Sequence, residues 1–225
     1  PNALKPGADD ILYKGDLAKW KKFANATLAR AYLHLSKRDQ SNYAKALSAA
    51  NASFTSFDDE PKFNYEASKG SPWHQFNDQR AGSFEPGDSY VELMNSLTDP
   101  RVAIFGATLN ASHPFLTVTA AMPFISYTEI QFIKAECALK TNDANAQTMY
   151  ADAVKTSFDQ LGLTSDYDAY FNANGVNTVS LENIITQKYI ANFLSSENFN
   201  DWRRTGLPDL KPNTGTEIPR RFPYP

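Results

Sequence analysis

The spacing of apolar side chains is the feature that most constrains how this chain can fold. In several separate segments these side chains recur at alternating intervals of three and four residues, which places them on one face of an α-helix. The longest series has the members Leu17, Trp20, Ala24, Leu28, Ala31 and Leu35. Asp16 precedes it and can cap the free amides of a first turn. The pattern predicts a helix that begins after Asp16, ends near Arg38 and packs this apolar stripe on the core.

A second series with helical spacing follows after a short break. Its members are Tyr43, Leu47, Ala50 and Phe54. Because a connection this short joins antiparallel neighbours, the two helices are expected to form one helical hairpin.

A second hairpin is predicted further along the chain. Ser126 and Glu129 have the spacing of a capping box at a helix start. The helix that follows is expected to end near Asn142, and a returning helix should end at Gly162. Small residues such as Ala135 allow the close helix approach found in tetratricopeptide-type units.

The C-terminal third predicts two more helices. Ser180 can cap a helix whose apolar positions are Leu181, Ile185, Tyr189 and Phe193. A short helix is expected over 197–205, where Gly206 can adopt a left-handed closing conformation and Pro208 prevents continuation.

Between 58 and 123 the helical spacing is lost, and proline and glycine recur throughout. This region is predicted to be a long loop region inserted between the hairpins, with one short helix from about Ser89 to Leu97. The expected fold class is therefore mainly α, with tetratricopeptide-like helical hairpins, long irregular loops and little β structure. We expect one domain over residues 1–225.

Charge and cysteine content exclude several classes of protein. The 225 residues carry 22 Lys and Arg against 25 Asp and Glu, a net charge of −3, which argues against the concentrated basic face that nucleic acids require. The mean hydropathy of −0.48 comes with no long apolar run that could span a bilayer. One cysteine excludes an internal disulfide framework and a cysteine-rich zinc site.

The residues offer little for catalysis. His34, His74 and His113 are far apart and have no metal-ligand spacing. The acidic run at 58–60 could supply a carboxylate pair for glycoside hydrolysis, but such runs are more often solvated surface. Cys137 lies on an apolar helix face and is expected to be an inert core thiol. We predict no catalytic residues, no metal site and no cofactor.

Several motifs, in this order along the chain, resemble those of the SusD/RagB family of outer-membrane nutrient-binding lipoproteins. The resemblance is closest to the SusD-like subgroup. The motifs are 13–17 (YKGDL), 99–101 (DPR), 127–136 (YTEIQFIKAE), 187–190 (QKYI), 202–208 (WRRTGLP) and 218–225 (IPRRFPYP).

The resemblance implies a non-enzymatic, surface-exposed lipoprotein of the cell outer membrane. It implies that an oligosaccharide or a peptide is captured for uptake through a SusC-like TonB-dependent barrel transporter, as in polysaccharide uptake. Family members are longer and begin with a lipid-modified cysteine. We therefore expect the N-terminal part, with its lipid anchor as the sole membrane attachment, to be absent from this chain.

Capture of a sugar needs aromatic faces for its C–H surface and polar groups for its hydroxyls. The segment 71–80 offers both kinds of side chain. Trp73 and Phe76 could stack on a ligand, and His74, Gln75, Asn77 and Arg80 could form hydrogen bonds with it. The alternative is that the two aromatic rings pin an irregular segment onto the helices, as buried aromatic side chains usually do.

Two other clusters favour a structural interpretation. The aromatic residues Tyr167, Tyr170 and Phe171 are expected to serve packing more than ligand contact. Arg203 and Arg204 could clamp an anion, but cations in the last turn of a helix also complement its dipole, and we interpret them as structural.

Two further functions stay open. One is a helical-repeat scaffold that binds a protein partner, and a less favoured one is a carbohydrate-active hydrolase. Binding of glycans without turnover would favour the nutrient-binding function over both.

Overall fold

Helices carry most of the ordered backbone in the computed structural model, which describes residues 6–173, 175–212 and 215–221. The α-helices are α1 (Leu17–Leu35), α2 (Asn42–Asn51), α3 (Pro72–Gln79), α4 (Asp88–Ser96), α5 (Val102–Phe105), α6 (Tyr127–Lys140), α7 (Ala146–Gln160), α8 (Tyr167–Phe171), α9 (Leu181–Ala191) and α10 (Glu197–Thr205). The 3-10 helices η1 and η2 span Phe57–Asp59 and Thr164–Asp166. The strands β1 (Lys62–Phe63) and β2 (Met122–Pro123) pair antiparallel. The predicted mainly α fold with little β structure is confirmed.

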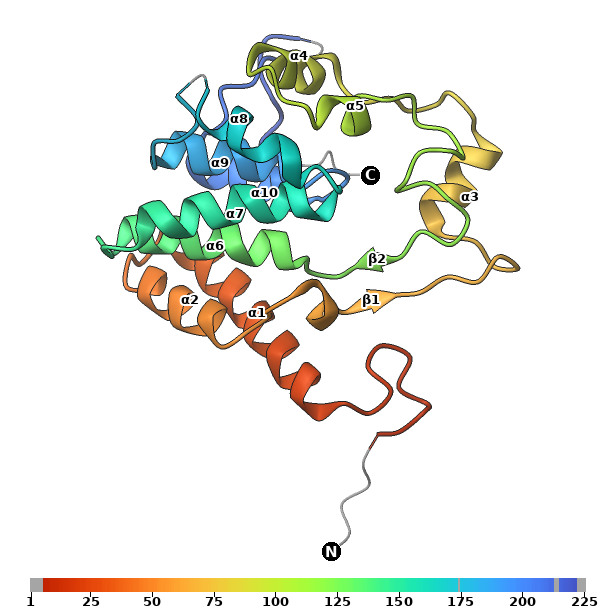
Figure 1. Ribbon diagram of the computed structural model, residues 1–225, viewed down its shortest axis with the longest axis horizontal. Helices are drawn as coiled ribbons and strands as arrows, with labels where there is room; N and C mark the ends of the chain where they lie inside the picture. Colours follow the sequence, from red (N-terminus) through yellow and green to blue (C-terminus); the bar gives the residue numbers. More distant parts are fainter. Residues whose placement is uncertain (1–5, 174, 213–214, 222–225) are drawn as a thin grey trace, which may run out of the picture.

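The helices are stacked in layers (Figure 1). The hairpin of α1 and α2 lies on one side of α6 and α7, and α9 lies on the other, while α10 contacts both α9 and α1. Asp16 caps α1 by accepting hydrogen bonds from the amides of Ala18 and Lys19, as predicted. Both predicted hairpins are present.

The orientation of α1 differs from the prediction. Its large apolar stripe faces outward: Leu17 is 52% exposed, and Leu28 and Leu35 are each 46% exposed. The buried face instead carries Ala26 and Ala29 with Leu33. Small side chains let α1 approach α2 and α6 closely, so tight packing uses the alanine face. Periodicity alone identifies an apolar face, whereas the shape of the neighbouring helices decides which face is covered.

Helix α6 lies at the centre of the bundle and is buried over most of its surface, including the charged residues Glu129 and Glu136. Ile130, Ile133 and Cys137 pack toward α1 and α2, and Phe132 and Ala135 pack toward α7 and α9. Its capping box is formed on one side only. The Ser126 hydroxyl accepts a hydrogen bond from the Glu129 amide, while the Glu129 carboxylate turns away to pair with an arginine.

The short helix α8 confirms the structural interpretation of the aromatic cluster near residue 170. Tyr170 and Phe171 are buried in the core formed with α7 and α9, and the ring of Tyr167 stacks on Phe171 at a centroid distance of 5.1 Å. These rings therefore belong to the core of the bundle.

The region 58–123 is more regular than predicted. Helix α4 matches the expected short helix, but α3 and α5 were predicted as loop. Ser71 caps α3 by accepting from the His74 amide, and Pro72 occupies the first helical turn, where proline is tolerated. In this segment Pro and Gly mark helix boundaries as well as loops. The division of the chain at 58 and 123 otherwise stays a prediction.

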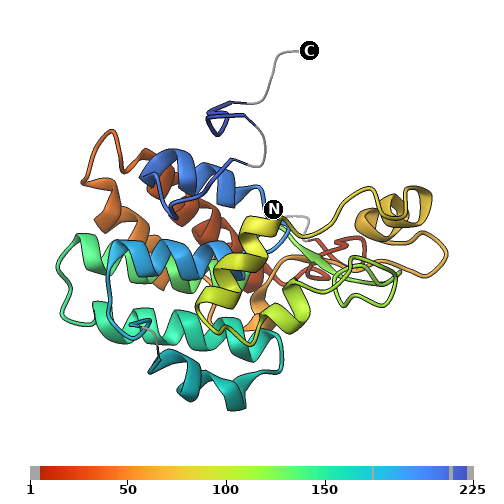
Figure 2. The ribbon, with the colours of Figure 1, turned by 90° about the horizontal axis from the view of Figure 1, so that it is seen from above.

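The pairing of β1 with β2 closes the base of this region. Lys62 lies opposite Pro123, and Phe63 lies opposite Met122. Beyond this ribbon, α3 lies apart from the bundle in both views (Figures 1 and 2). Helices α4 and α5 instead pack on α9 through Tyr90, Met94, Phe105 and Ile190.

Arginine side chains of the 99–101 and 202–208 motifs form ion pairs and hydrogen bonds that join different helices. Arg101 is fully buried, and its guanidinium binds Asp99, Ser157 and Gln187, which ties the 99–101 turn to α7 and α9. Arg204 binds Glu136 and thereby ties α10 to α6. Arg203 is exposed, but like Arg204 it lies in the last turn of α10, where its charge complements the helix dipole, so the structural interpretation agrees with the position of both arginines. Gly206 adopts the predicted left-handed conformation with φ of 77°. The last four residues of the 218–225 motif lie outside the described residues.

Candidate functional site

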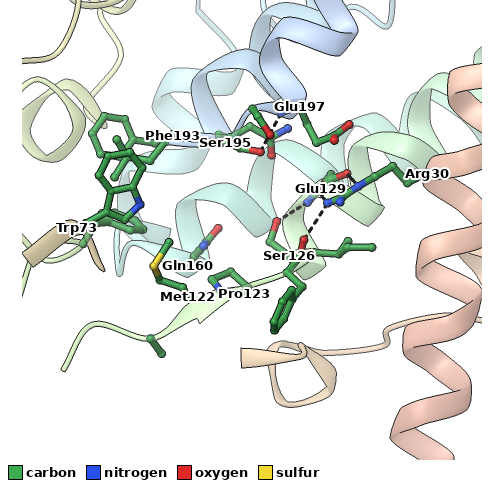
Figure 3. Close-up of a pocket in the computed structure, with 18 residues that line it drawn as sticks. Arg30, Trp73, Met122, Pro123, Ser126, Glu129, Gln160, Phe193, Ser195 and Glu197 are labelled. Carbon is green, nitrogen blue, oxygen red and sulfur yellow. Dashed lines mark hydrogen bonds and ion pairs between the residues drawn. The ribbon is translucent and has the colours of Figure 1, made fainter. Parts of the chain in front are cut away.

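A cavity of about 260 Å³ opens between α6, the segment that joins α9 to α10, and the strand β2. Its wall combines side chains from segments that are far apart in the sequence. The residues that line it include Arg30, Trp73, Phe115, Met122, Glu129, Gln160, Asn192, Phe193, Leu194, Ser195 and Glu197. Trp73 and Phe193 lie at one end, and Arg30 with Glu129 lies at the other (Figure 3).

The aromatic end is rigid because its rings pack on one another. Phe193 stacks on Phe105 at a centroid distance of 4.9 Å and an interplanar angle of 25°. Phe115 meets Phe193 at 5.6 Å, edge to face. Trp73 of α3 lies at the same end of the cavity, and its ring centroid is 5.7 Å from that of Phe84. These rings offer half-buried aromatic surface at a fixed position.

The polar end is built on an ion pair between the half-buried Arg30 and the buried Glu129. Arg30 Nε lies 2.8 Å from Glu129 Oε1, and Nη2 lies 2.6 Å from Oε2. Nη2 also donates to the backbone oxygen of Phe124 at 3.1 Å. This bidentate geometry fixes both side chains and is the strong form of charge-assisted hydrogen bonding.

A second carboxylate reaches the cavity from α10. Glu197 Oε2 lies 2.8 Å from His34 Nε2. Burial acts to raise the pKa of Glu197, but the hydrogen bond with His34 and the charge of Arg30 outweigh it, so the pKa is lowered. Glu197 is therefore placed as an ionised acceptor.

The two carboxylates do not form the couple that glycoside hydrolysis uses. That reaction needs one carboxyl group that stays protonated as general acid, and its pKa must be raised. Glu129 is held by both oxygens on Arg30, and the pKa of Glu197 is lowered. The arrangement is suited to holding a ligand through hydrogen bonds and aromatic contact.

Of the six residues predicted to bind a ligand, Trp73 is the one that lines this cavity. Two others hold backbone in place. His74 Nδ1 lies 3.0 Å from the Leu116 backbone oxygen. The side-chain amide of Gln75 donates through Nε2 to the backbone oxygens of Lys69 and Gly70. Their polar groups fix the segments beside α3, which agrees with the structural alternative for these two positions.

The other three predicted residues lie on different faces of α3 or just after it. Phe76 is 40% exposed, and the Arg80 guanidinium lies 5.7 Å from its ring centroid. Asn77 is buried, and its Oδ1 has no hydrogen-bond partner. The sequence prediction treated the segment as a loop, whereas a helix turns successive side chains by about 100° and separates them. The ligand role of all six residues stays a prediction.

Sequence reasoning missed most of the cavity wall. Phe193 was assigned to the apolar stripe of a helix, but α9 ends at Ala191 and leaves Phe193 in the connecting segment. Arg30 and Glu129 are 99 residues apart, and no local pattern links them. The capping-box position of Glu129 was the one available signal, and it pointed to a different role.

The described ranges contain neither a cluster of metal-binding side chains nor a helix that could span a membrane. No group of three or more His, Cys, Asp or Glu side chains there could hold a metal ion. Among the helices of residues 6–173, 175–212 and 215–221, none combines the length and apolar character needed to cross a bilayer.

Solved structures share this fold. A chitin-binding protein has 24% identity and a TM-score of 0.76, with 96% of this chain covering 60% of that one. A SusD/RagB family protein from Bacteroides thetaiotaomicron has 24% identity and a TM-score of 0.69, with coverage of 88% and 55%. A SusD homologue from Bacteroides fragilis has 19% identity and a TM-score of 0.75, with coverage of 93% and 59%. The chain thus spans less than two thirds of the length of each.

The family-level match extends over almost the whole sequence. No curated protein matches the chain. The sequence model of the SusD-like family, described as starch-binding and associating with the outer membrane, matches residues 2–114 and 107–225. The helical fold and the ordered motifs agree with this match, and the chain belongs to the SusD-like family.

Proposed function

We propose that this protein binds an oligosaccharide at the outer membrane, in the cavity between Trp73, Phe193 and Arg30. The observation that carries the proposal is the division of the cavity wall into an aromatic end and a polar end. The family description as starch-binding, and the chitin-binding name of one solved neighbour, support a carbohydrate ligand.

The division matches the two surfaces of a sugar. A pyranose ring has C–H faces that pack on aromatic rings, and Trp73 and Phe193 offer such rings at one end of the cavity. Its hydroxyls must find hydrogen-bond partners when they leave water. Gln160, Asn192 and Ser195 lie on the same wall and carry amide or hydroxyl groups.

The wider role follows from family membership. The bound oligosaccharide would pass to a SusC-like TonB-dependent barrel transporter for uptake. The protein would sit on the cell surface as a lipoprotein. A peptide is the alternative ligand, and it would use the same aromatic end.

Calorimetric titration with malto-oligosaccharides and chito-oligosaccharides tests the binding site. Trp73→Ala should weaken binding by at least about tenfold, because it removes one aromatic wall of the cavity. Trp202→Ala is the matched control, since it makes the same change at a half-buried position that does not line the cavity. The control should bind as the unaltered protein does, and the sugar should be recovered uncleaved.

Unchanged affinity in Trp73→Ala, with a sugar that binds the unaltered protein, would exclude this cavity as the site. Loss of affinity in Trp202→Ala alone would move the site to α10. Release of shorter sugars would instead support the hydrolase alternative.

A scaffold for a protein partner is the second candidate, and the outward face of α1 favours it. Leu17, Leu28 and Leu35 form an exposed apolar stripe that a partner helix could cover. Maleimide labelling of Leu28→Cys tests this, with Lys140→Cys as an exposed control. Protection of Leu28→Cys in intact cells, with Lys140→Cys still labelled, would support a partner; equal labelling would contradict it.

A further inference from the structure

A second hollow lies next to the candidate cavity. Its volume is also about 260 Å³, and its wall includes Phe84, Ser89, Tyr90, Tyr189 and Asn198. None of these residues belongs to the site proposed above. The wall again combines aromatic rings with polar groups.

The two hollows share part of their walls. Phe193 and Leu194 line both of them. In addition, Trp73 lines the first and Phe84 lines the second, and these two rings are in contact at a centroid distance of 5.7 Å. Aromatic surface therefore continues from one hollow to the next through Phe193 and through the contact of Trp73 with Phe84.

The dividing segment has an unusual backbone. Leu194 has φ of 61°, a left-handed conformation that a residue with a large side chain rarely adopts. Such conformations persist where the surroundings enforce them, and they cluster at ligand sites. This conformation occurs at the residue that separates the hollows.

Each hollow also has an amide atom that lacks a partner. Asn192 lines the first hollow and is 5% exposed, and its Nδ2 makes no hydrogen bond. Asn198 lines the second hollow, and its Oδ1 makes none. Since buried amide atoms are nearly always paired in folded proteins, such groups are expected to meet ligand hydroxyls after a small side-chain rotation.

The volume of the two hollows together is closer to that of a ligand pocket than the volume of either hollow alone. Ligand pockets occupy about 300 to 1,000 Å³, and each hollow alone falls just below that range. Joined along Phe193 and Leu194, they fall within it. A ligand that fills both must be longer than one that fills the first.

We infer that the two hollows are adjacent subsites of one groove, and that the ligand is a linear oligosaccharide that passes over Phe193 and Leu194 from one to the other. The inference rests on the proposed sugar binding in the first hollow. It adds the second subsite, with Phe84 and Tyr189 as its aromatic wall and Asn198 as its unpaired acceptor.

Blocking the second hollow while leaving the first intact tests this arrangement. Ser89 lines the second hollow near the start of α4, so Ser89→Trp would fill it. Ser96→Trp is the matched control, because it makes the same change at an exposed position of the same helix. Affinities are measured by calorimetry for malto-oligosaccharides and chito-oligosaccharides of two, four and six sugars.

In the unaltered protein and in Ser96→Trp, affinity should rise by at least about tenfold from two to six sugars. In Ser89→Trp the disaccharide should bind unchanged and the rise should disappear. A rise that persists in Ser89→Trp, or that is absent from the unaltered protein, would overturn the second subsite while leaving the first in place. Failure of every sugar to bind the unaltered protein would refute both; an extended peptide that binds instead would refute the oligosaccharide assignment.

Hydrogen exchange of the unaltered protein gives a second readout that needs no variant. The hexasaccharide should slow exchange of amides in 84–91, whereas the disaccharide should not. Equal protection by the two sugars, or none by either, would contradict a second subsite at this place.

Discussion

Arg204 on α10 binds both carboxylate oxygens of Glu136 on α6, and its Nη2 lies 2.8 Å from Oε2. The same Nη2 lies 2.8 Å from Asp201 Oδ1, and Asp201 also pairs with Lys188 at 2.7 Å. All four side chains are nearly inaccessible to solvent. A network of two cations and two anions thus joins α6, α9 and α10.

Removal of one member should leave buried charge without a partner. We expect Arg204→Ala to lower the free energy of unfolding by about 3–5 kcal/mol, as is typical when one half of a buried pair is lost. Urea unfolding followed by circular dichroism measures this. Arg203→Ala is the control, since its exposed side chain should contribute within about 0.5 kcal/mol. Similar losses in both variants would contradict the assignment of the network to Arg204.

Replacing Arg101 with lysine, which keeps the positive charge, should still lower the stability of the fold. Its Nη1 lies 2.8 Å from Ser157 Oγ, and Nη2 lies 2.6 Å from Asp99 Oδ2 and 2.5 Å from Gln187 Oε1. Lysine lacks the planar fork that reaches these groups together. Arg101→Lys should cost at least about 2 kcal/mol in urea unfolding, because buried acceptors lose charged donors. Arg80→Lys, at an exposed position, should be nearly neutral; an equally small effect at Arg101 would disprove the role.

The loss of folding stability at acidic pH should depend on Asp201. Burial acts to raise its pKa, but Lys188 and Arg204 outweigh this and lower it. A carboxyl group whose folded pKa lies below its unfolded value, about 3.9, stabilises the fold above that value. This contribution is lost as the pH falls through the folded pKa.

We therefore expect the free energy of unfolding to be nearly level from pH 7 to about 5 and to fall below about pH 4. Asp201→Asn should be less stable at pH 7 and should show a shallower decline in acid. Urea unfolding at a series of pH values measures both slopes. Parallel slopes would show that other carboxyl groups dominate.

Two leucines on α1 should differ strongly in how much stability the same change costs. Leu33 is 1% exposed in the core, whereas Leu28 is 46% exposed on the outward stripe. Leu33→Ala should lower the free energy of unfolding by about 2–5 kcal/mol, because it leaves a cavity. Leu28→Ala should stay within about 0.5 kcal/mol. The reverse order in urea unfolding would mean that the stripe predicted from the sequence is the buried one.

Short-range features were predictable because their causes lie within a few residues. Asp16 and Ser180 cap helices whose starts they were expected to mark, and Gly206 closes α10 in the left-handed conformation. Cys137 is buried, as its apolar helix face indicated, and burial raises the pKa of its thiol. The caps and the left-handed glycine depend on the local backbone and on side chains one or two turns away, whereas the burial of Cys137 also needs the helices α1 and α2 that cover this face.

Of the residues that line the candidate cavity, the sequence analysis predicted one, Trp73, as a ligand-binding residue. The prediction placed six neighbours in sequence on one ligand, and α3 distributes them over separate surfaces. The polar end depends on Arg30 meeting Glu129 across 99 residues, and the aromatic end depends on Phe193 meeting rings from α5 and the segment after it. No spacing in the sequence encodes such meetings.

The sequence by itself determined that the chain forms helices, where most of them begin and end, and which family it resembles. The tertiary structure decided which face of α1 is covered, which carboxylates are paired, and which side chains meet around the cavity. The physical reason is range: caps, turns and periodicity act over one or two helical turns, whereas burial and ion pairing depend on surfaces that distant segments bring together.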